Sequence, residues 1–476
     1  MIGLPGLMSM LLAAAGIVFL LPRRTLAANP FLPLWERIPD GEPRVYVDPE
    51  TGQKRLYVYG SHDTAGSGKF CDFKLKVWSA DVNDLNNWIC HGDSFHTRAD
   101  RDHESDTPWT DGELYAPDVI EKDGKYYLYA YIFYAKGCVA VSDRPEGPFR
   151  LLSQYRVPAM YENDMDRGVF VDPGVLVDDD GRVYIYWGFE RSYMAEINPE
   201  NMYEILPGSV RKDIIPAGNG PSDFYEACSP RKIGDRYYLI YSPRKGSRLD
   251  YAVSKSPTGP FEYGGTIIDN GVDYPGGNNH GSICNINGQW YVFYHRMTNN
   301  SVFSRRACVE RIEILDDGRI PQVEMTSLGF EGSLSPYRYV PADIACVLKG
   351  GCYITERNIF QRAVVNITDG CVIGFKYFDF GEDHSSRTME FSAKIRGCGA
   401  RGQVRILIDD WKEGMEIGRC DIGLDDSIIY SAVRCVTGRH ALYFVFEDKY
   451  GDVWDFAKPG FENRPICELE GFVFSK

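Results

Sequence analysis

The sequence lacks the residues that several common chemistries require. Histidine is scarce, with 8 in 476 residues, and neither a Gly-x-Ser-x-Gly nucleophile motif nor a phosphate-binding loop occurs. Helical periodicity is weak along the whole chain, which disfavours an all-α or α/β fold. The net charge of -15 argues against a nucleic-acid partner, because phosphate binding depends on clustered Lys and Arg. Carboxylates acting on a neutral, hydroxyl-rich substrate are the chemistry that this composition allows.

Cysteine usage and the N-terminus bear on the compartment of the protein. The 13 cysteines show no CxxC motif and no zinc-type spacing, which favours free, buried thiols and a cytoplasmic location. Residues 1–28 are mostly apolar, with Arg23-Arg24 ahead of Ala27 and Ala28. This segment is interpreted as a signal peptide without a basic start, as a short membrane anchor, or as sequence upstream of the true start. Secretion or membrane contact depends entirely on this segment.

A repeated hairpin signal is the strongest pattern in the chain. In each copy, turn residues and one polar residue precede an alternating run of aromatic and β-branched residues, which is typical of a strand that follows a tight turn. We call these runs the lead strands. They begin near Leu56, Tyr126, Val183, Tyr237 and Trp290.

The spacing of the lead strands predicts a five-bladed β-propeller. Their starts lie about 50 to 70 residues apart, which suits four-stranded blades. A large irregular β-sandwich is the alternative, but it would need no such register. We therefore expect an all-β chain with a propeller over 29–325, a linker over 326–340 and a β-sandwich over 341–476. We also expect the lead strands to lie innermost.

Three carboxylates stand out as candidate catalytic groups. Asp40, Asp172 and Glu226 each precede the inner strand of a different blade, so all three are expected to meet at one end of the central channel. Like charges held together in apolar surroundings raise the pKa of one member, which produces a neutral acid beside an ionised base. Each residue alone is more commonly a turn cap or a solvated loop acid. Their joint placement favours the catalytic interpretation.

Several motifs resemble glycoside hydrolase family 43, whose members are five-bladed propellers. The resemblance covers 29–320 and rests on Asn29-Pro30, Pro39-Asp40-Gly41, Tyr115-Ala116-Pro117-Asp118-Val119, Asp172-Pro173-Gly174, Asn279-His280-Gly281-Ser282 and Tyr294-His295-Arg296. Glu226 stands where the family's acid is expected, although Ala227 replaces the glycine that many members have next to it.

The resemblance implies a role for each carboxylate. Asp40 corresponds to the general base, Glu226 to the general acid, and Asp172 to the residue that raises the pKa of Glu226 and orients it. It also implies inversion of configuration, which requires the base and acid carboxyls to be about 6.5 to 9.5 Å apart so that a water fits between them.

Five further residues are expected to bind substrate. The resemblance marks Tyr115, Asp118, His280 and Arg296, and Trp187 ends the lead strand that follows Asp172. Plainer roles are a turn cap for Asp118, a core position for His280 and a strand-end ion pair for Arg296. No cofactor is expected, and the resemblance allows a structural Ca²⁺ near His280.

The C-terminal region resembles family 6 carbohydrate-binding modules, through 375–381 and the strand 442–446. Sugar binding needs exposed aromatic rings as platforms, and only Trp411, Tyr450 and Trp454 are candidates. A purely structural support for the propeller is the alternative for this domain.

The function expected from these features is hydrolysis of plant cell-wall oligosaccharides or polysaccharides such as xylan. The specificities considered are α-L-arabinofuranosidase and β-xylosidase, with an exo-galactosidase or arabinanase as a further alternative. A catalytically silent sugar-binding propeller is the alternative from another class. The presence of all three carboxylates favours the enzyme. Retaining fructan hydrolases share the propeller, but their Trp-Met-Asn-Asp-Pro opening is absent.

Overall fold

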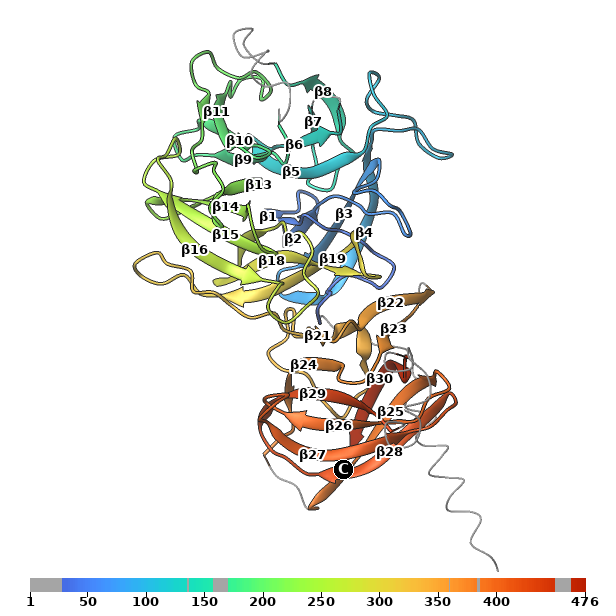
Figure 1. Ribbon diagram of the computed structural model, residues 1–476. Coiled ribbons are helices and arrows are strands. Elements are labelled where there is room, and N and C mark those ends of the chain that lie inside the picture. The colour runs from blue at the N-terminus through green and yellow to red at the C-terminus, as the bar shows by residue number, and fades with distance from the viewer. Residues whose placement is uncertain (1–27, 135–136, 157–169, 359, 383–385, 450–463) are drawn as a thin grey trace, which may run out of the picture.

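The computed structural model describes residues 28–134, 137–156, 170–358, 360–382, 386–449 and 464–476. Regular structure in these residues is almost entirely β-strand, arranged in seven antiparallel sheets. Figure 1 shows two bodies, an upper one built from β1 to β19 and a lower one that holds the later strands. The all-β class expected from the sequence is confirmed.

Five of the sheets form the blades of the propeller. Blade one contains β1 (Glu42–Val47), β2 (Lys54–Tyr59), β3 (Lys74–Asp81) and β4 (Asp84–His96). Blade two contains β5 (Leu114–Lys122), β6 (Lys125–Ile132), β7 (Cys138–Ser142) and β8 (Arg150–Gln154). Blade three contains β9 (Gly174–Val177), β10 (Val183–Trp187), β11 (Tyr193–Ile197) and β12 (Arg211–Lys212). Blade four contains β13 (Phe224–Ile233), β14 (Arg236–Pro243), β15 (Arg248–Ser254) and β16 (Glu262–Asp269), and blade five contains β17 (Ser282–Ile286), β18 (Gln289–Thr298) and β19 (Ser301–Ile312).

The repeated hairpin turns explain this register. The turn before each lead strand contains one glycine with a positive φ, namely Gly52, Gly124, Gly181, Gly234 and Gly288. A residue without a Cβ takes this conformation at little cost, so the same tight turn recurs in every blade. Each lead strand lies in a different sheet, as the propeller prediction requires.

The lead strands are not innermost, and this expectation was wrong. Each one is the second strand of its sheet, while the strand before the turn faces the axis. These first strands are β1, β5, β9, β13 and β17, and they contact one another around the axis. The error arose because β10 and its equivalents carry the stronger apolar signal. That signal reports that a strand is buried between neighbouring sheets. It does not report which strand faces the axis.

The start of the described chain closes the ring of blades. The amide of Phe31 donates to the carbonyl of Ala307 on β19, and the side-chain amide of Asn29 donates to the carbonyl of Val309. The first residues of the propeller therefore lie beside the last strand of blade five. This pairing ties blade five to blade one.

The lower body is a β-sandwich of two sheets. One sheet has the order β22-β23-β30-β25-β28, with β20 beside β30, and the other has the order β21-β24-β29-β26-β27. A cluster of phenylalanines fills the space between the sheets, including Phe375, Phe391, Phe444 and Phe472. The elements are β20 (Val340–Pro341), η2 (Ala342–Ile344), β21 (Val347–Lys349), β22 (Tyr353–Asn358), β23 (Gln361–Ile367), β24 (Val372–Asp379), β25 (Thr388–Gly397), β26 (Gly402–Ile408), β27 (Met415–Ile422), β28 (Ser427–Arg434), β29 (Arg439–Asp448) and β30 (Cys467–Ser475).

The two bodies share a continuous interface. Glu356 of β22 accepts hydrogen bonds from Arg37 and Arg306 of the propeller, and Lys376 of β24 lies 2.9 Å from Glu324. One hydrophobic cluster includes residues of blades four and five together with the sandwich core. Among the aromatic candidates for sugar binding, Trp411 is partly buried under the ammonium of Lys412, whereas Tyr450 and Trp454 lie outside the described residues.

Every cysteine lies in the described part of the chain, and all of them are free thiols. Most are buried, as the sequence suggested, and Cys90 and Cys398 are exposed. Within the described ranges, no helix is long and apolar enough to cross a membrane. The N-terminal segment 1–27, on which the signal-peptide and anchor interpretations depend, lies outside them.

Candidate active site

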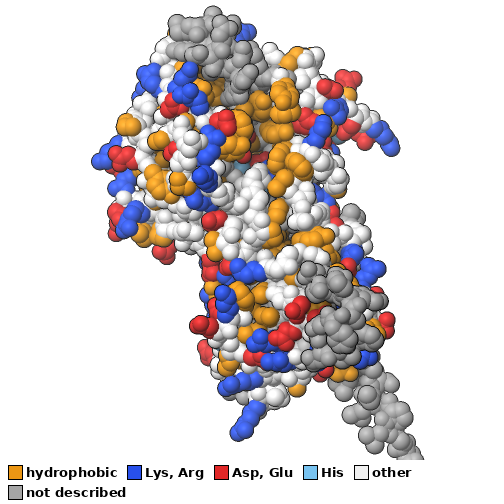
Figure 2. Space-filling model, in the orientation of Figure 1, with side chains coloured by type: hydrophobic (Ala, Val, Ile, Leu, Met, Phe, Trp, Pro, Cys, Tyr) orange, Lys and Arg blue, Asp and Glu red, His pale blue; other side chains and the backbone are white. Residues whose placement is uncertain are grey.

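The three candidate carboxylates come together at the starting ends of the inner strands. Asp40 and Asp172 immediately precede β1 and β9, and Glu226 lies near the start of β13. The amide of Ala227 donates a hydrogen bond to Asp172, which places Asp172 beside Glu226. Asp40 acts electrostatically on both. Figure 2 shows a hollow in the propeller face with histidine at its floor and apolar side chains along its sides.

Backbone strain accompanies this arrangement. Asp40, Asp172 and Ala227 have φ values of 58°, 50° and 68°, in the left-handed region that favours glycine. Ala227 is the position at which the sequence departs from the family's glycine. The backbone conformation that glycine adopts freely is kept here by alanine, at the cost of some strain.

Asp40 is a buried carboxylate held in its ionised form. Its Oδ1 accepts a hydrogen bond from Arg305 at 2.8 Å, and its Oδ2 accepts one from the Ser61 hydroxyl at 2.7 Å. Burial alone would raise its pKa, but the charge of Arg305, the nearby His280 and His295 and the Ser61 hydrogen bond lower it below the usual value. Asp40 is therefore an ionised acceptor at neutral pH.

Glu226 and Asp172 shift in the opposite direction. Burial raises the pKa of Glu226 to about 7, and the charge of Asp40 adds to the rise while Arg305 opposes it. Burial, Glu226 and Asp40 also raise the pKa of Asp172 well above its usual value. The sequence-based hypothesis made the charge of Asp172 the main cause of the Glu226 shift. In the structure burial is the largest cause and the charge of Asp40 is the next, and the pKa of Asp172 is itself raised.

Two histidines complete the ring of polar groups around Asp40. The Nδ1 atom of His280 lies 3.6 Å from Asp40 and 3.8 Å from Asp172, so His280 bridges two of the acids, close to the axis. The Nδ1 atom of His295 accepts from the Asp40 amide at 3.3 Å. Burial and the charge of Arg305 lower the pKa of His295 to about 3, so this imidazole is neutral.

The residues around His280 do not form a calcium cage. Calcium takes six to eight oxygen ligands. The charged groups next to His280 are the carboxylates of Asp40 and Asp172, so these protein oxygens alone do not reach that number. A structural Ca²⁺ near His280 therefore stays a prediction.

Asp118 faces the axis but is committed to an ion pair. Both of its oxygens accept from Arg44 of β1, and Oδ2 also accepts from the amide of Val175 of β9 at 2.8 Å. The carboxylate is fully buried and joins three blades. Its burial and its bonds to Arg44 and Val175 favour the structural role over the expected substrate contact.

Trp187 and Arg296 were assigned wrongly to substrate. Trp187 has no exposed surface and stacks on Tyr193 in the core of blade three, because its strand is the second of the sheet. Arg296 is buried beneath the sandwich, where it donates to the Tyr294 hydroxyl at 2.7 Å and lies 3.5 Å from Glu310. The ion-pair alternative holds for Arg296.

Tyr115 lies near the acid cluster. Its ring stacks on Phe133 at 5.4 Å, and the neighbouring Ala116 amide donates to Ser61, which in turn bonds Asp40. A second aromatic pair consists of Tyr225, which precedes Glu226 in the sequence, and Phe189, with ring centroids 5.1 Å apart. Exposed faces of such rings suit the apolar face of a sugar.

Sequence reasoning missed Arg305, which is the cation of the site. Arg305 is buried in β19 and holds Asp63 through two nitrogens at 3.0 and 2.8 Å while it bonds Asp40. The available signal was the pair Arg305-Arg306 inside an otherwise buried strand. A buried arginine requires an acidic partner, so this pair could have been linked to a carboxylate site.

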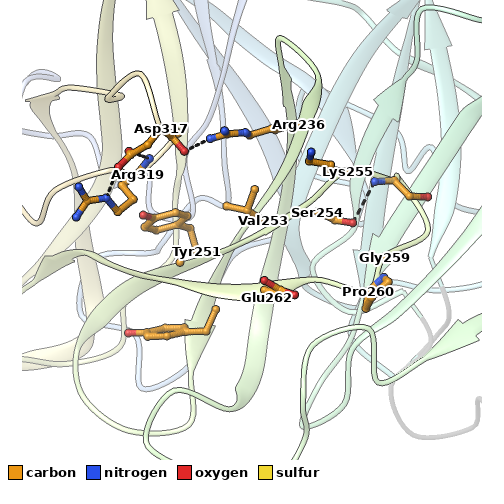
Figure 3. A pocket seen from close by; sticks show the side chains of 14 residues that line it. Arg236, Tyr251, Val253, Ser254, Lys255, Gly259, Pro260, Glu262, Asp317 and Arg319 are labelled. Atoms are coloured by element: carbon orange, nitrogen blue, oxygen red, sulfur yellow. Dashed lines mark hydrogen bonds and ion pairs between the residues drawn. The ribbon is translucent and has the colours of Figure 1, made fainter.

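A cavity also lies away from the acids. Figure 3 shows it between Arg236, Tyr251, Glu262 and Arg319, with a volume of about 540 Å³. It lies at the turn end of blade four, where Ile233 pairs with Arg236, whereas Glu226 pairs with Ser242 at the other end of the same sheet. This cavity is therefore separate from the acid cluster.

Comparisons with known proteins point to one family. The family model for glycosyl hydrolases family 43 matches residues 48–320. A xylosidase/arabinosidase of Thermoclostridium stercorarium is 36% identical, over 88% of this chain and 95% of its own length. A β-xylosidase of Xylanibacter ruminicola is 32% identical, over 57% of this chain and 93% of its own length.

One solved structure covers both bodies. It is a family 43 arabinoxylan arabinofuranohydrolase from Bacillus subtilis in complex with cellotetraose, with a TM-score of 0.51, 22% identity, and coverage of 94% of this chain and 97% of that one. At this identity the likeness concerns the fold alone. From the match of the family model and the similarity over nearly the whole length of the first relative, we conclude that this chain belongs to glycosyl hydrolases family 43 and is a glycosidase.

Proposed function

We propose that the protein hydrolyses arabinofuranosyl or xylosyl linkages of xylan-type oligosaccharides with inversion, using Asp40 as base and Glu226 as acid. The observation that carries this proposal is the opposite pKa shift of two carboxyls in one hollow, lowered at Asp40 and raised to about 7 at Glu226. Such a pair supplies an ionised base and a protonated acid at the same pH. The two relatives described above, a xylosidase/arabinosidase and a β-xylosidase, support the sugar class.

Asp40 has the features of a general base. Arg305 and Ser61 fix its orientation and favour its charged form, and a water on its free side can lose a proton to it as the water attacks the anomeric carbon. The neutral His295 accepts from the Asp40 backbone and helps to hold the strained residue in place.

Glu226 has the features of a general acid. It is protonated up to about neutral pH and partly accessible, so it can donate its proton to the departing glycosidic oxygen. Asp172 accepts a hydrogen bond from the amide of Ala227, next to Glu226, and its titration is coupled to that of Glu226. Asp172 is therefore a positioning residue. The Tyr115–Phe133 and Phe189–Tyr225 pairs provide stacking surfaces near the acid cluster.

The sandwich, in this proposal, supports the propeller. Its contacts through Glu356 and Lys376 and the shared hydrophobic cluster are extensive. Trp411, the one described aromatic candidate for sugar binding, is partly buried.

A substrate screen with product analysis tests the proposal. Aryl α-L-arabinofuranoside, β-D-xyloside and β-D-galactofuranoside are compared, and NMR follows the anomer released first. We expect hydrolysis of the first or second compound, with the product anomer opposite to that of the substrate. Retention of configuration would overturn the assigned mechanism, preference for galactofuranoside would overturn the sugar class, and binding without turnover would identify a silent sugar-binding protein.

A further inference from the structure

A second cluster of chemically active side chains lies at the outer edge of blade one. Ligand atoms of Asp93, His96 and His103 all lie within 4.8 Å of one another, and they form the only such His, Cys, Asp or Glu group among the described residues. Asp93 and His96 belong to the end of β4, and His103 belongs to the loop between β4 and β5. We propose that these three residues bind one first-row transition-metal ion, with Zn²⁺ as the ion that fits best.

The state of His96 is the observation that points to a ligand. Its side chain is only 4% exposed, yet its Nε2 atom has no hydrogen-bond partner. A buried polar atom without a partner is costly and rare in folded proteins. A metal ion bonded to this nitrogen removes that cost.

His103 has a carboxylate partner on one of its ring nitrogens. Its Nδ1 atom lies 3.4 Å from Oδ1 of Asp100, and the same oxygen accepts from the amides of Asp102 and His103. A carboxylate on one ring nitrogen fixes the tautomer and directs the other nitrogen at a metal, as in many zinc sites. Nε2 is therefore the ligand atom of His103.

The two imidazoles stack with ring centroids 4.2 Å apart and an angle of 16° between the planes. An ion lies in the plane of an imidazole that binds it, so one ring must turn out of this stack for both to bind the same ion. His103 is the ring free to turn, because it is exposed whereas His96 is buried.

Asp93 supplies the third ligand. Its carboxylate lies 3.1 Å from the ammonium of Lys74, which is partly exposed and can turn toward solvent when a divalent cation takes its place. Two nitrogens and one carboxylate oxygen with an open fourth position suit Zn²⁺ in a tetrahedral site, whereas Ca²⁺ and Mg²⁺ prefer all-oxygen sites.

Such an ion would brace the loop that leads to β5. Thr97 already bonds the carbonyl of Gly112 across the base of this loop, and β5 with Tyr115 follows directly. The site would link the end of β4 to the loop tip, so its effect is expected on stability and loop order. The acid cluster holds none of its ligands.

The test uses tag-free, chelator-treated protein titrated with Zn²⁺ by calorimetry, with elemental analysis after dialysis. We expect one ion per chain and a thermal midpoint that rises with Zn²⁺ concentration. His103→Gln should weaken binding on the order of 10²-fold or more, and Asp100→Asn about 10- to 100-fold. His440→Gln is the matched control, because this histidine lies in the sandwich beside Asp409, and it should leave the affinity unchanged.

Three outcomes would overturn the site. They are a stoichiometry below one at saturation, an affinity that His103→Gln leaves unchanged, and a loss of affinity in His440→Gln equal to that in His103→Gln. Because His103 is partly exposed, its variant should fold, and circular dichroism checks this. Lys74→Gln gives an independent readout: removing the competing ammonium should tighten Zn²⁺ binding, and weaker binding would contradict the role of Asp93.

Discussion

Two buried ionic clusters lie along the inner strands, and they differ in charge balance. Asp118, midway along β5, pairs with Arg44, and Glu42, the first residue of β1, pairs with Arg231 and lies 3.3 Å from Arg44. Burial raises the pKa of Glu42, but both guanidiniums oppose the rise directly. Two arginines thus face two carboxylates, and this balanced cluster joins the blades.

At the starting ends of the same strands, the acids outnumber the cations. Arg305 is shared between Asp40 and Asp63, and no cation pairs with Glu226 among the described residues. The positive charge of Arg305 lowers the pKa of Asp40, whereas the pKa values of Glu226 and Asp172 are raised. The comparison teaches that a lack of countercharge, and not burial alone, distinguishes a catalytic group of acids from a structural one.

The largest effect is expected at Asp40. Asp40→Asn removes the proposed base and should lower kcat by about 10² to 10⁴ on an aryl arabinofuranoside or xyloside. Folding should persist, because Arg305 keeps its pairing with Asp63. Asp235→Asn, at an exposed turn of blade four, serves as the control. Near-normal turnover in Asp40→Asn would remove this residue from the mechanism.

A large effect of another kind is expected at Asp118. Asp118→Asn removes the main charge partner of the buried Arg44 and leaves it only Glu42, at 3.3 Å. Breaking a buried ion pair typically costs about 3 to 5 kcal/mol of folding free energy. Denaturant unfolding measures this loss, and kcat per folded molecule should stay within a few-fold of the parent value. If Asp118→Asn abolished turnover without loss of stability, the contrast between the two clusters would fail.

The smallest effect is a shift of the pH profile. The acid must be protonated, so activity falls as pH rises through the pKa at which the Asp172 and Glu226 pair loses its last proton. Repulsion between the two charged carboxylates raises that pKa. Asp172→Asn removes the repulsion, so the alkaline limb of kcat/KM should move to lower pH. If the alkaline limb of the profile stayed at the same pH, the titration of Glu226 would not depend on Asp172.

The propeller could be predicted from the sequence because its signal is local. Each hairpin is recognisable from a turn with glycine followed by an alternating strand. Five copies at regular spacing predict five blades. Which strand faces the axis could not be predicted this way, since the pattern reports burial and not direction. For this reason Trp187 was expected at the substrate site, whereas its strand is buried between sheets.

The acids were found because each has a distinctive local context, but their partners were not. Arg305 lies 265 residues from Asp40, and only the closed ring of blades brings them together. The motif likeness points to Arg296, which instead serves the interface with the sandwich. The Asp93–His96–His103 group has no standard zinc spacing, so no sequence pattern predicts it.

The central claim is that Glu226 is the acid and Asp40 the base. It is tested most directly by kcat/KM of Glu226→Gln on two substrates, a dinitrophenyl glycoside, whose leaving group needs no proton, and an unactivated disaccharide. The account predicts a loss on the order of 10² or more on the disaccharide and a much smaller loss on the activated substrate. Asp40→Asn should reduce both alike. Equal losses on both substrates in Glu226→Gln would contradict the assignment.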